Sequence, residues 1–491
     1  MSELTPRRRA LILATCCVSM IVVVMDISIV NVALPAMHRD LHAPESGLQW
    51  TVDAYTLVLA SFLVLAGSTA DRIGRRRVFQ AGLATFGLGS LLCGLAPGTG
   101  WLIAARALQA AGGTMLNPTA MAIVANAYPE PARRARAIGV FGSMSGLALA
   151  LGPVLGGVLV DAFGWRSVFW VNVPVTAIGI VAAALFVRES RAARARRPDP
   201  AGQALMIAML GGVVYAIIES GRLGWTSPPI LAALAVAASA ALGVLLYEPR
   251  RADPLLELRL FRSVPFSSAI AMALFALCGF GTFLFLATQY LQDVRGISAL
   301  AAGLCLLPVG VPVLLLSPWA GRLTGTRGPR LPLLAAGTAL VLGGAASLAL
   351  APATPLPAVL GTYVLFGVFL GFVNPPVTNT AVSGMPLSMT GLAASLASTG
   401  RQAGTTLGVA IAGAVVGPAL ARGSSAAGGA AFTTAEHGIW WLVIGLGAGI
   451  VVLGLLSTGR RAAATAARAA ALFPEAENGP ANRTGARQPV A

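Results

Sequence analysis

Long apolar runs alternate with short polar stretches from one end of the chain to the other. The runs Leu11 to Pro35 and Phe266 to Leu291 are each long enough to cross a hydrocarbon core, which takes roughly 20 helical residues. About fourteen such runs follow one another, and the pattern predicts an all-α integral membrane protein. The expected spans are residues 11–36, 47–69, 78–96, 100–124, 137–160, 167–187, 202–220, 229–247, 264–290, 298–319, 331–350, 356–383, 392–417 and 437–457.

The composition agrees with this class of protein and narrows its function. Hydrophobic residues make up 56% of the chain and charged residues 11%, values that soluble domains of this length do not show. All 34 basic residues are Arg. Because both a Walker A loop and Schiff-base chemistry need Lys, we expect neither ATP hydrolysis nor a Lys-dependent enzyme. Heavy use of Ala, Gly and Arg is typical of a GC-rich bacterial genome.

The arginines are unevenly divided between the two sides of the predicted membrane. Alternate loops hold clusters, at residues 7–9, 72–77, 133–136, 188–197, 250–262, 322–330 and beyond 460. The intervening loops hold at most one each, namely Arg39, Arg166, Arg222, Arg295 and Arg422. Cytoplasmic loops carry the excess of basic residues. We therefore expect a multi-pass protein of the bacterial plasma membrane, with both termini cytoplasmic, in contact with lipid and not with nucleic acid.

A faint internal repeat indicates two related bundles. Gly67 and Gly74 follow span 2, and Gly321 and Gly328 follow span 10 at the same separation, with an Arg two residues after each second glycine. Repeated bundles that meet at a midplane site are typical of rocking transporters. We expect a six-helix bundle over residues 1–187, a linker with two inserted spans over 188–263, a second six-helix bundle over 264–457 and a disordered cytoplasmic tail over 458–491.

Three ionisable residues lie inside the first spans, where a charge near the bilayer centre costs about 2.5–3.5 kcal/mol to insert. They are Asp26, Asp53 and Arg106. At ~1.5 Å per residue, Asp26 lies roughly 22 Å from the cytoplasmic end of its span, whereas Asp53 and Arg106 lie roughly 9 Å below the outer surface. These depths nearly coincide in a core about 30 Å thick. Two carboxylates that share one guanidinium cannot both ionise cheaply, so we expect this group to bind and release the coupling proton.

Four motifs occur in order along the first five spans. They are Met25-Asp26-Ile-Ser-Ile-Val-Asn31-Val-Ala-Leu-Pro35, Gly67 through Arg77, Arg106-Ala-Leu-Gln109-Ala-Ala-Gly112 and Gly152-Pro153-Val-Leu-Gly156-Gly157. Together they resemble the signatures of the fourteen-span drug/proton antiporter family of the major facilitator superfamily. The resemblance covers nearly all of the chain except its two tails. It implies the major facilitator fold and the proton-driven export of drugs, antibiotics or similar compounds.

The same resemblance implies roles for the motifs. It assigns proton coupling to Asp26 and Arg106. It also implies a conformational latch on the cytoplasmic side, formed by Gly67, Asp71, Arg72, Gly74, Arg75 and Arg76. The fourth motif marks exporters; its glycines permit close helix contact and its proline bends the span, so we expect a hinge or seal at Gly152, Pro153, Gly156 and Gly157. Ala110 and Ala148 stand where the family commonly has glycine.

Aromatic and polar side chains near these groups are the candidates for contact with cargo. Phe283 and Gln289 lie in span 9, and Asn31, Tyr55 and Gln109 lie one or two turns from the acidic residues. Aromatic faces suit flat or cationic organic molecules. The five cysteines fall in apolar runs without metal-ligand spacing. We therefore expect no metal and no cofactor apart from the coupling protons, and a protein that functions as a monomer.

Other functions stay open at this level. A proton symporter that imports a metabolite would share most of these features, although the exporter motif argues against it. A polytopic membrane enzyme needs a nucleophile, metal or diphosphate site, and none of the three His residues lies in the interior of a predicted span. A channel is disfavoured because the glycines form no repeated filter loops.

Overall fold

Helices make up nearly all of the computed structural model, which describes residues 5–191, 199–251, 254–385, 389–420 and 426–473. Those ranges contain no strand. The α-helices are α1 (Pro6–Leu41), α2 (Glu45–Ile73), α3 (Arg75–Gly94), α4 (Thr99–Ala127), α5 (Pro131–Phe163), α6 (Ser167–Trp170), α7 (Asn172–Phe186), α8 (Pro200–Leu223), α9 (Pro228–Tyr247), α10 (Val264–Gln289), α11 (Ala299–Cys305), α12 (Leu307–Arg327), α13 (Arg330–Ser347), α14 (Leu356–Val382), α15 (Thr390–Leu420), α16 (Ala426–Ser457) and α17 (Arg460–Ala470). Short 3-10 segments lie at Glu248–Arg250 and Leu258–Arg262, and a π turn at Tyr290–Val294.

The all-α membrane architecture predicted from the apolar runs is confirmed. Each expected span coincides with a helix or, for spans 6 and 10, with a pair of helices (α6 with α7, α11 with α12). Among the described residues, ten helical stretches are long and apolar enough to cross a membrane, or eleven if the bent α2 counts as one span. The helices at the other three positions, α3, α4 and α15, are 20, 29 and 31 residues long but less apolar.

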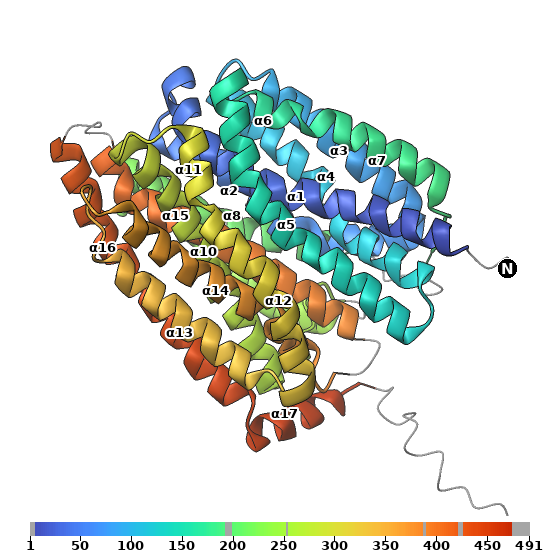
Figure 1. The fold of residues 1–491 in the computed structure, drawn as a ribbon. Helices are drawn as coiled ribbons and strands as arrows, with labels where there is room; N and C mark the ends of the chain where they lie inside the picture. Colours follow the sequence, from blue (N-terminus) through green and yellow to red (C-terminus); the bar gives the residue numbers. More distant parts are fainter. Residues whose placement is uncertain (1–4, 192–198, 252–253, 386–388, 421–425, 474–491) are drawn as a thin grey trace, which may run out of the picture.

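The helices pack in two groups (Figure 1). In the first half, defined as α1 to α7, α4 packs against α2 and α3, α1 against α5, and α7 against α3. In the second half, defined as α10 to α16, α10 packs against α15 and α14, and α13 against α14 and α16. The two halves meet where α2 packs against α15 and where α5 packs against α11 and α12.

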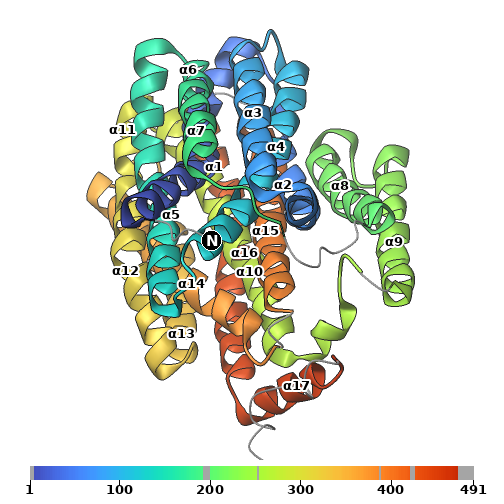
Figure 2. The same ribbon diagram turned by 90° about the vertical axis from the view of Figure 1, so that its right-hand side faces the viewer.

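Helices α8 and α9 stand beside both halves (Figure 2). They pack against each other, and α8 also contacts α2 and α15. Two hydrogen bonds connect α8 to α2. Trp50 Nε1 donates to Glu219 Oε1 at 3.1 Å, and Gln203 Nε2 donates to the carbonyl oxygen of Ser61 at 2.6 Å. Helix α8 therefore touches one helix of each half at the place where α2 and α15 meet.

The predicted disordered tail is wrong for residues 460–470, which form α17. This segment is rich in Ala, the residue with the highest helix propensity. Ala462, Ala466 and Ala469 form its buried face, and Thr465 Oγ1 accepts a hydrogen bond from the backbone N–H of Val264 at 3.0 Å. Helix α17 therefore packs against the start of α10. The rest of the predicted tail, from residue 474, lies outside the described residues.

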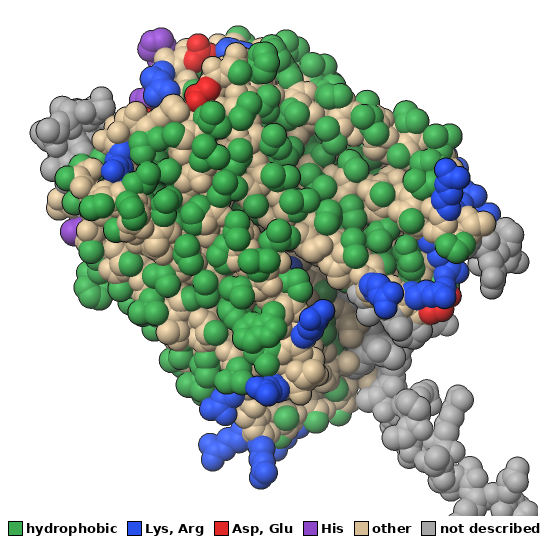
Figure 3. Space-filling view, in the orientation of Figure 1, with side chains coloured by type: hydrophobic (Ala, Val, Ile, Leu, Met, Phe, Trp, Pro, Cys, Tyr) green, Lys and Arg blue, Asp and Glu red, His purple; other side chains and the backbone are tan. Residues whose placement is uncertain are grey.

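Basic side chains gather at one end of the molecule, which we call the Arg-rich end. It comprises the starts of α1, α3 and α5 and the junction of α12 with α13, with arginines at positions 7–9, 75–77, 133, 134, 136, 327 and 330. There Arg9 donates hydrogen bonds to Glu130, which lower the pKa of that carboxyl. Figure 3 shows the surface hollowed between the two halves at this end.

Candidate functional site

Asp26 on α1 and Arg106 on α4 form a buried ion pair inside the first half. Arg106 Nη1 lies 2.5 Å from Asp26 Oδ2, and the side chains are 1% and 0% exposed. Gln109 Nε2 and Asn172 Nδ2 donate to Asp26 Oδ1 at 2.7 and 3.1 Å. Gln109 Nε2 also donates to Ser90 Oγ at 2.7 Å. Four helices, α1, α3, α4 and α7, thus meet at these five residues, which we call the acid–base group.

Arg106 is held from several directions. Its Nε donates to the carbonyl oxygen of Thr51 at 3.0 Å, and Nη1 donates to Gln109 Oε1 at 2.6 Å. The guanidinium carbon lies 4.2 Å from the centre of the Tyr55 ring and 5.7 Å from that of Phe169, within cation–π range. Two side chains predicted to contact cargo, Tyr55 and Gln109, therefore contact the arginine of the acid–base group.

Asp53 does not belong to this group, and the prediction that it does is wrong. It forms no ion pair with Arg106, and neither carboxyl oxygen has a hydrogen-bond partner among the described residues. Asp53 lies one turn from Gln49 and from Thr56, on the face of α2 that packs against α15; Thr406 Oγ1 donates to Thr56 Oγ1 there at 2.7 Å. Depth along a helix axis does not fix the direction in which a side chain points.

The other candidate cargo residues are buried. Asn31 on α1 donates to the backbone of its own helix at 2.7 Å. Phe283 on α10 stacks on Phe366 of α14, with ring centres 4.0 Å apart, and meets Tyr363 edge-on at 5.1 Å. Gln289, at the end of α10, is 2% exposed. Phe283 and Gln289 lie on α10 of the second half, whereas Asn31 and the acid–base group lie in the first half.

The expected latch residues make their polar contacts within the first half. They are Gly67, Asp71, Arg72, Gly74, Arg75 and Arg76, at the junction of α2 and α3. Arg75 forms an ion pair with Asp71 at 2.8 Å. The backbone N–H of Arg76 donates to Glu189 Oε1 at 3.1 Å. Gly74 has a φ of +130°, which favours glycine, and an added Cβ would lie 2.5 Å from that carboxylate.

The glycines of the fourth motif lie where α5 touches both halves. An added Cβ at Gly156 would lie 2.8 Å from Ile29 of α1, and one at Gly152 would collide with Ser28. On the other side, an added Cβ at Gly157 would lie 2.5 Å from the Cα of Leu300 on α11. These close approaches need glycine, as the sequence predicted for a seal.

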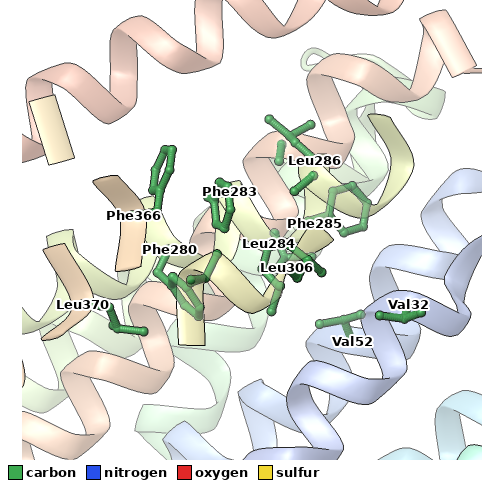
Figure 4. Close-up of a cluster of buried hydrophobic side chains, with 14 of the residues drawn as sticks. Val32, Val52, Phe280, Phe283, Leu284, Phe285, Leu286, Leu306, Phe366 and Leu370 are labelled. Carbon is green, nitrogen blue, oxygen red and sulfur yellow. The ribbon is translucent and has the colours of Figure 1, made fainter. Parts of the chain in front are cut away.

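Further contacts close the end of the molecule opposite the Arg-rich end. Asp161 Oδ2 of α5 accepts the backbone N–H of Leu300 at 3.0 Å, and Gln292 Nε2 donates to the carbonyl oxygen of Val32 at 2.9 Å. Figure 4 shows an apolar cluster in the same region, in which Val32 and Val52 of the first half approach Leu306 and its neighbours. We call all of these contacts, with those of Gly157, the seal.

No comparable close approach is described for the glycines near the Arg-rich end of α5 and α12. An added Cβ at Gly139 or Gly142, in the first part of α5, would have no described residue within 4 Å, and the same holds for Gly325 near the end of α12. The two halves are therefore joined at one end of α5 and separated at the other, which agrees with the hollow in Figure 3.

Two ionisable residues inside helices of the second half were missed by the sequence reasoning. Arg401 lies in α15, and Glu436 lies within α16 and is 2% exposed. The signal was present in both cases, because each falls within or directly beside an expected span. Asn172 and Ser90 were missed as members of the acid–base group, because an Asn or Ser in an apolar helix gives no charge signal.

No group of three or more His, Cys, Asp or Glu side chains within the described ranges could hold a metal ion. His38 and His42, spaced four apart, are both exposed. The five cysteines are free and buried.

Comparison with known proteins adds the following. Residues 16–409 match the Major Facilitator Superfamily. The chain is 38% identical to "Multidrug resistance protein Stp" of Mycobacterium tuberculosis, over 84% of this chain and 76% of that protein. It is 36% identical to "Puromycin resistance protein pur8" of Streptomyces alboniger (80% and 78%) and 35% identical to "Methylenomycin A resistance protein" of Streptomyces coelicolor (90% and 92%). A POT family transporter of known structure, 16% identical, shares the fold with a TM-score of 0.63 over 90% of this chain and 94% of that one.

Proposed function

Because the chain belongs to the Major Facilitator Superfamily, we propose that it exports small organic compounds in exchange for protons. Its relatives are multidrug and antibiotic resistance proteins, and one is named as an export protein. On this basis the chain is an efflux transporter. Drugs or antibiotics are the proposed cargo, and proton exchange is the proposed driving reaction.

The acid–base group is the observation that carries proton exchange. Three donors face the Asp26 carboxylate, which stabilises its charge in this state. A proton on Asp26 removes the charge that compensates Arg106, and an uncompensated buried charge is strongly unfavourable. Protonation therefore favours a different packing of α1, α4 and α7. A titratable group whose charge biases two arrangements of the helices is the element that antiport requires.

Asp53 is proposed as a second proton site. Both of its carboxyl oxygens are buried without a hydrogen bond of normal geometry to any described residue, an environment that favours the uncharged acid. It lies on the joint between α2 and α15. When the seal opens, water reaches this joint and the Asp53 proton can exchange with the outer solution. Asp26, Asp53 and Arg106 then form the proton-coupling residues, although not in one cluster.

The open end sets the direction of loading. Basic residues favour the cytoplasmic side, so we assign the Arg-rich end, with both termini, to the cytoplasm of a bacterial plasma membrane. The separated halves then accept cargo from the cytoplasm, as an exporter must. The latch pair Asp71–Arg75 is disengaged from the second half in this state. We propose one rocking bundle over residues 1–187 and another over 264–457, acting as a monomer, with Asn31, Phe283 and Gln289 as cargo contacts.

Efflux in cells tests the proposal. A susceptible bacterial host that expresses the protein should tolerate higher concentrations of at least one compound from a panel that includes puromycin and ethidium. Asp26→Asn should abolish this tolerance, since it removes the titratable group but keeps the side-chain volume. Glu130→Gln removes a carboxylate at the exposed Arg-rich end and should match the wild type. A variant Asp26→Asn that is inserted in the membrane and still confers full tolerance would refute the assignment.

A further inference from the structure

Arg401 is a charged side chain inside α15 that lacks an acidic partner. Its guanidinium forms no ion pair with any described carboxylate, whereas Arg106 in the first half has Asp26. Its described partners are neutral: Nη2 donates to Ser398 Oγ at 2.5 Å, and Nη1 donates to Thr378 Oγ1 at 3.4 Å. A guanidinium has five N–H donors and a full positive charge, so these hydroxyls leave its charge uncompensated.

The faces of α15 show where Arg401 points. Gly404 and Gly408 face α10, because an added Cβ on them would meet the carbonyl oxygens of Leu274 and Cys278. Thr406 faces α2, where it bonds to Thr56. At 3.6 residues per turn, Arg401 lies about 20° from Gly408 and about 140° from Thr406 around α15. It therefore points away from α2 and reaches Thr378 of α14, and it is only partly buried.

The surroundings of Arg401 are polar and partly exposed. Asn374, Thr378, Ser398 and Gln402 are all partly exposed, and none is acidic. Helical side chains tilt toward the helix N-terminus, which for α15 is the Arg-rich end. The hollow between the halves opens at that end (Figure 3). A molecule that enters there meets an unpaired guanidinium flanked by hydroxyl and amide groups.

Asp53, the other unpartnered charge near this joint, does not neutralise Arg401. The pairing of Thr56 with Thr406 sets the register of the antiparallel α2 and α15. In that register Asp53 lies level with residue 409 of α15, eight residues or ~12 Å beyond Arg401. The two side chains also leave their helices in different directions, since Asp53 faces α15 directly.

We propose that Arg401 binds a carboxylate or comparably acidic group of the exported compound. The inference rests on the proposed export function and names a chemical class of cargo for it. A planar guanidinium can bind a carboxylate through two parallel hydrogen bonds, which a neutral amide cannot match. Ser398 and Thr378 orient the planar guanidinium of Arg401. The second half thus supplies cargo recognition, while the first half supplies the acid–base group.

Calorimetric titration of the purified full-length protein tests this inference with salicylate as the probe and salicylamide as its neutral counterpart. Wild-type protein should bind salicylate saturably and salicylamide about tenfold or more weakly, because only the former is anionic. Arg401→Gln should remove this preference. Arg401→Lys, which keeps the charge but lacks the planar guanidinium, should retain it in part. Arg327→Gln, at the exposed end of α12, should match the wild type.

Three outcomes would overturn the inference: no saturable salicylate binding, equal binding of the two probes, or an unchanged preference in Arg401→Gln. A lipid phosphate offers the same chemistry, so the titration is repeated in nanodiscs. Salicylate binding that persists in phosphatidylcholine but disappears in phosphatidylglycerol would assign the site to a lipid headgroup and refute a cargo site. Proton-driven efflux is measured separately, so a failure of the export proposal leaves the titration interpretable, and the reverse also holds.

Discussion

Asp26 and Asp53, both in the first half, have different hydrogen-bonding environments. The Asp26 carboxylate accepts hydrogen bonds from Arg106, Gln109 and Asn172, whereas the Asp53 carboxyl oxygens form no hydrogen bond of normal geometry with any described residue. The first environment stabilises a carboxylate and the second a neutral acid. Contrasting environments of this kind are how proteins assign acid and base roles.

The contrast predicts opposite effects on stability. Asp26→Ala should destabilise the protein by about 3–5 kcal/mol, because it leaves Arg106 buried without its counter-charge. Asp53→Asn should change stability little, because the amide resembles the protonated acid in shape and charge. Unfolding of the purified variants in mixed detergent micelles at neutral pH measures both. Equal destabilisation by the two substitutions would show that Asp53 is ionised and paired in the folded protein.

For single residues, the sequence predicts how deep a side chain lies in the membrane but not the direction in which it points from its helix. Asp26 and Arg106 were placed together correctly from their distances to the span ends. Asp53 was misplaced, because Tyr55, two residues further along α2, is the side chain that faces Arg106. Arg401 is detectable as a charge in an apolar helix, but its lack of a partner is a property of the packing.

At the scale of elements, α5 connects the acid–base group to the seal. Gly152 and Gly156 bring α5 against α1 next to Asp26, and Gly157 brings it against α11 one residue later. A change of packing around α1 is therefore expected to affect the contact of α5 with α11. The glycines of the motif make these two contacts from two faces of one helix.

Gly157→Ala should weaken this seal. Its Cβ would lie 2.5 and 2.6 Å from backbone atoms of α11, which cannot move aside as a flexible side chain can. Spin labels at Phe163 and Leu304, both exposed on α5 and α11, report the separation by pulsed electron resonance. We expect longer distances and lower export in this variant.

Gly142→Ala is the matched control, because an added Cβ there meets no described residue within 4 Å. It should leave the label distances and export unchanged. A distance distribution in Gly157→Ala that coincides with that of Gly142→Ala would contradict the account of the seal.

Helix positions were the most predictable part of the structure, since long apolar runs determine them directly. The breaks at Val171 and Leu306, which divide spans 6 and 10, were not predicted, although Pro174 and Pro308 follow them and lack the backbone N–H that a continuous helix needs. Helix α17 was missed for a different reason. Its composition of Ala and Arg suits a solvated tail, and only its contact with α10 shows that it is folded.

At the scale of the whole molecule, the structure has one closed and one open end. Contacts between α2 and α15 and between α5 and α12 connect the two halves beyond the seal, and we call them the joint; α8 touches both helices of the first contact. A rocking motion about this joint would open the seal and close the hollow. Alternating access of this kind exposes the cargo space and Asp53 to opposite sides in turn.

Accessibility to an impermeant thiol reagent tests which side is open. In a background without native cysteines, Gln402→Cys should react from the cytoplasmic side, in inside-out vesicles, because the hollow opens at the Arg-rich end. Asp40→Cys, on an exposed position at the sealed end, should react only in right-side-out vesicles. Reaction of Gln402→Cys solely from the outer side would reverse either the orientation or the state assigned here.

Coupled flux in liposomes tests the central claim most directly. Purified protein is reconstituted with no nucleotide and no ion gradient other than protons, and uptake of a compound identified by the susceptibility panel is followed with internal pyranine as the pH reporter. With an acidic interior, we predict that wild type and Glu130→Gln accumulate the compound as the interior becomes alkaline, and that Asp26→Asn does neither. Equal accumulation after the pH gradient is collapsed, or in Asp26→Asn, would contradict proton exchange at Asp26.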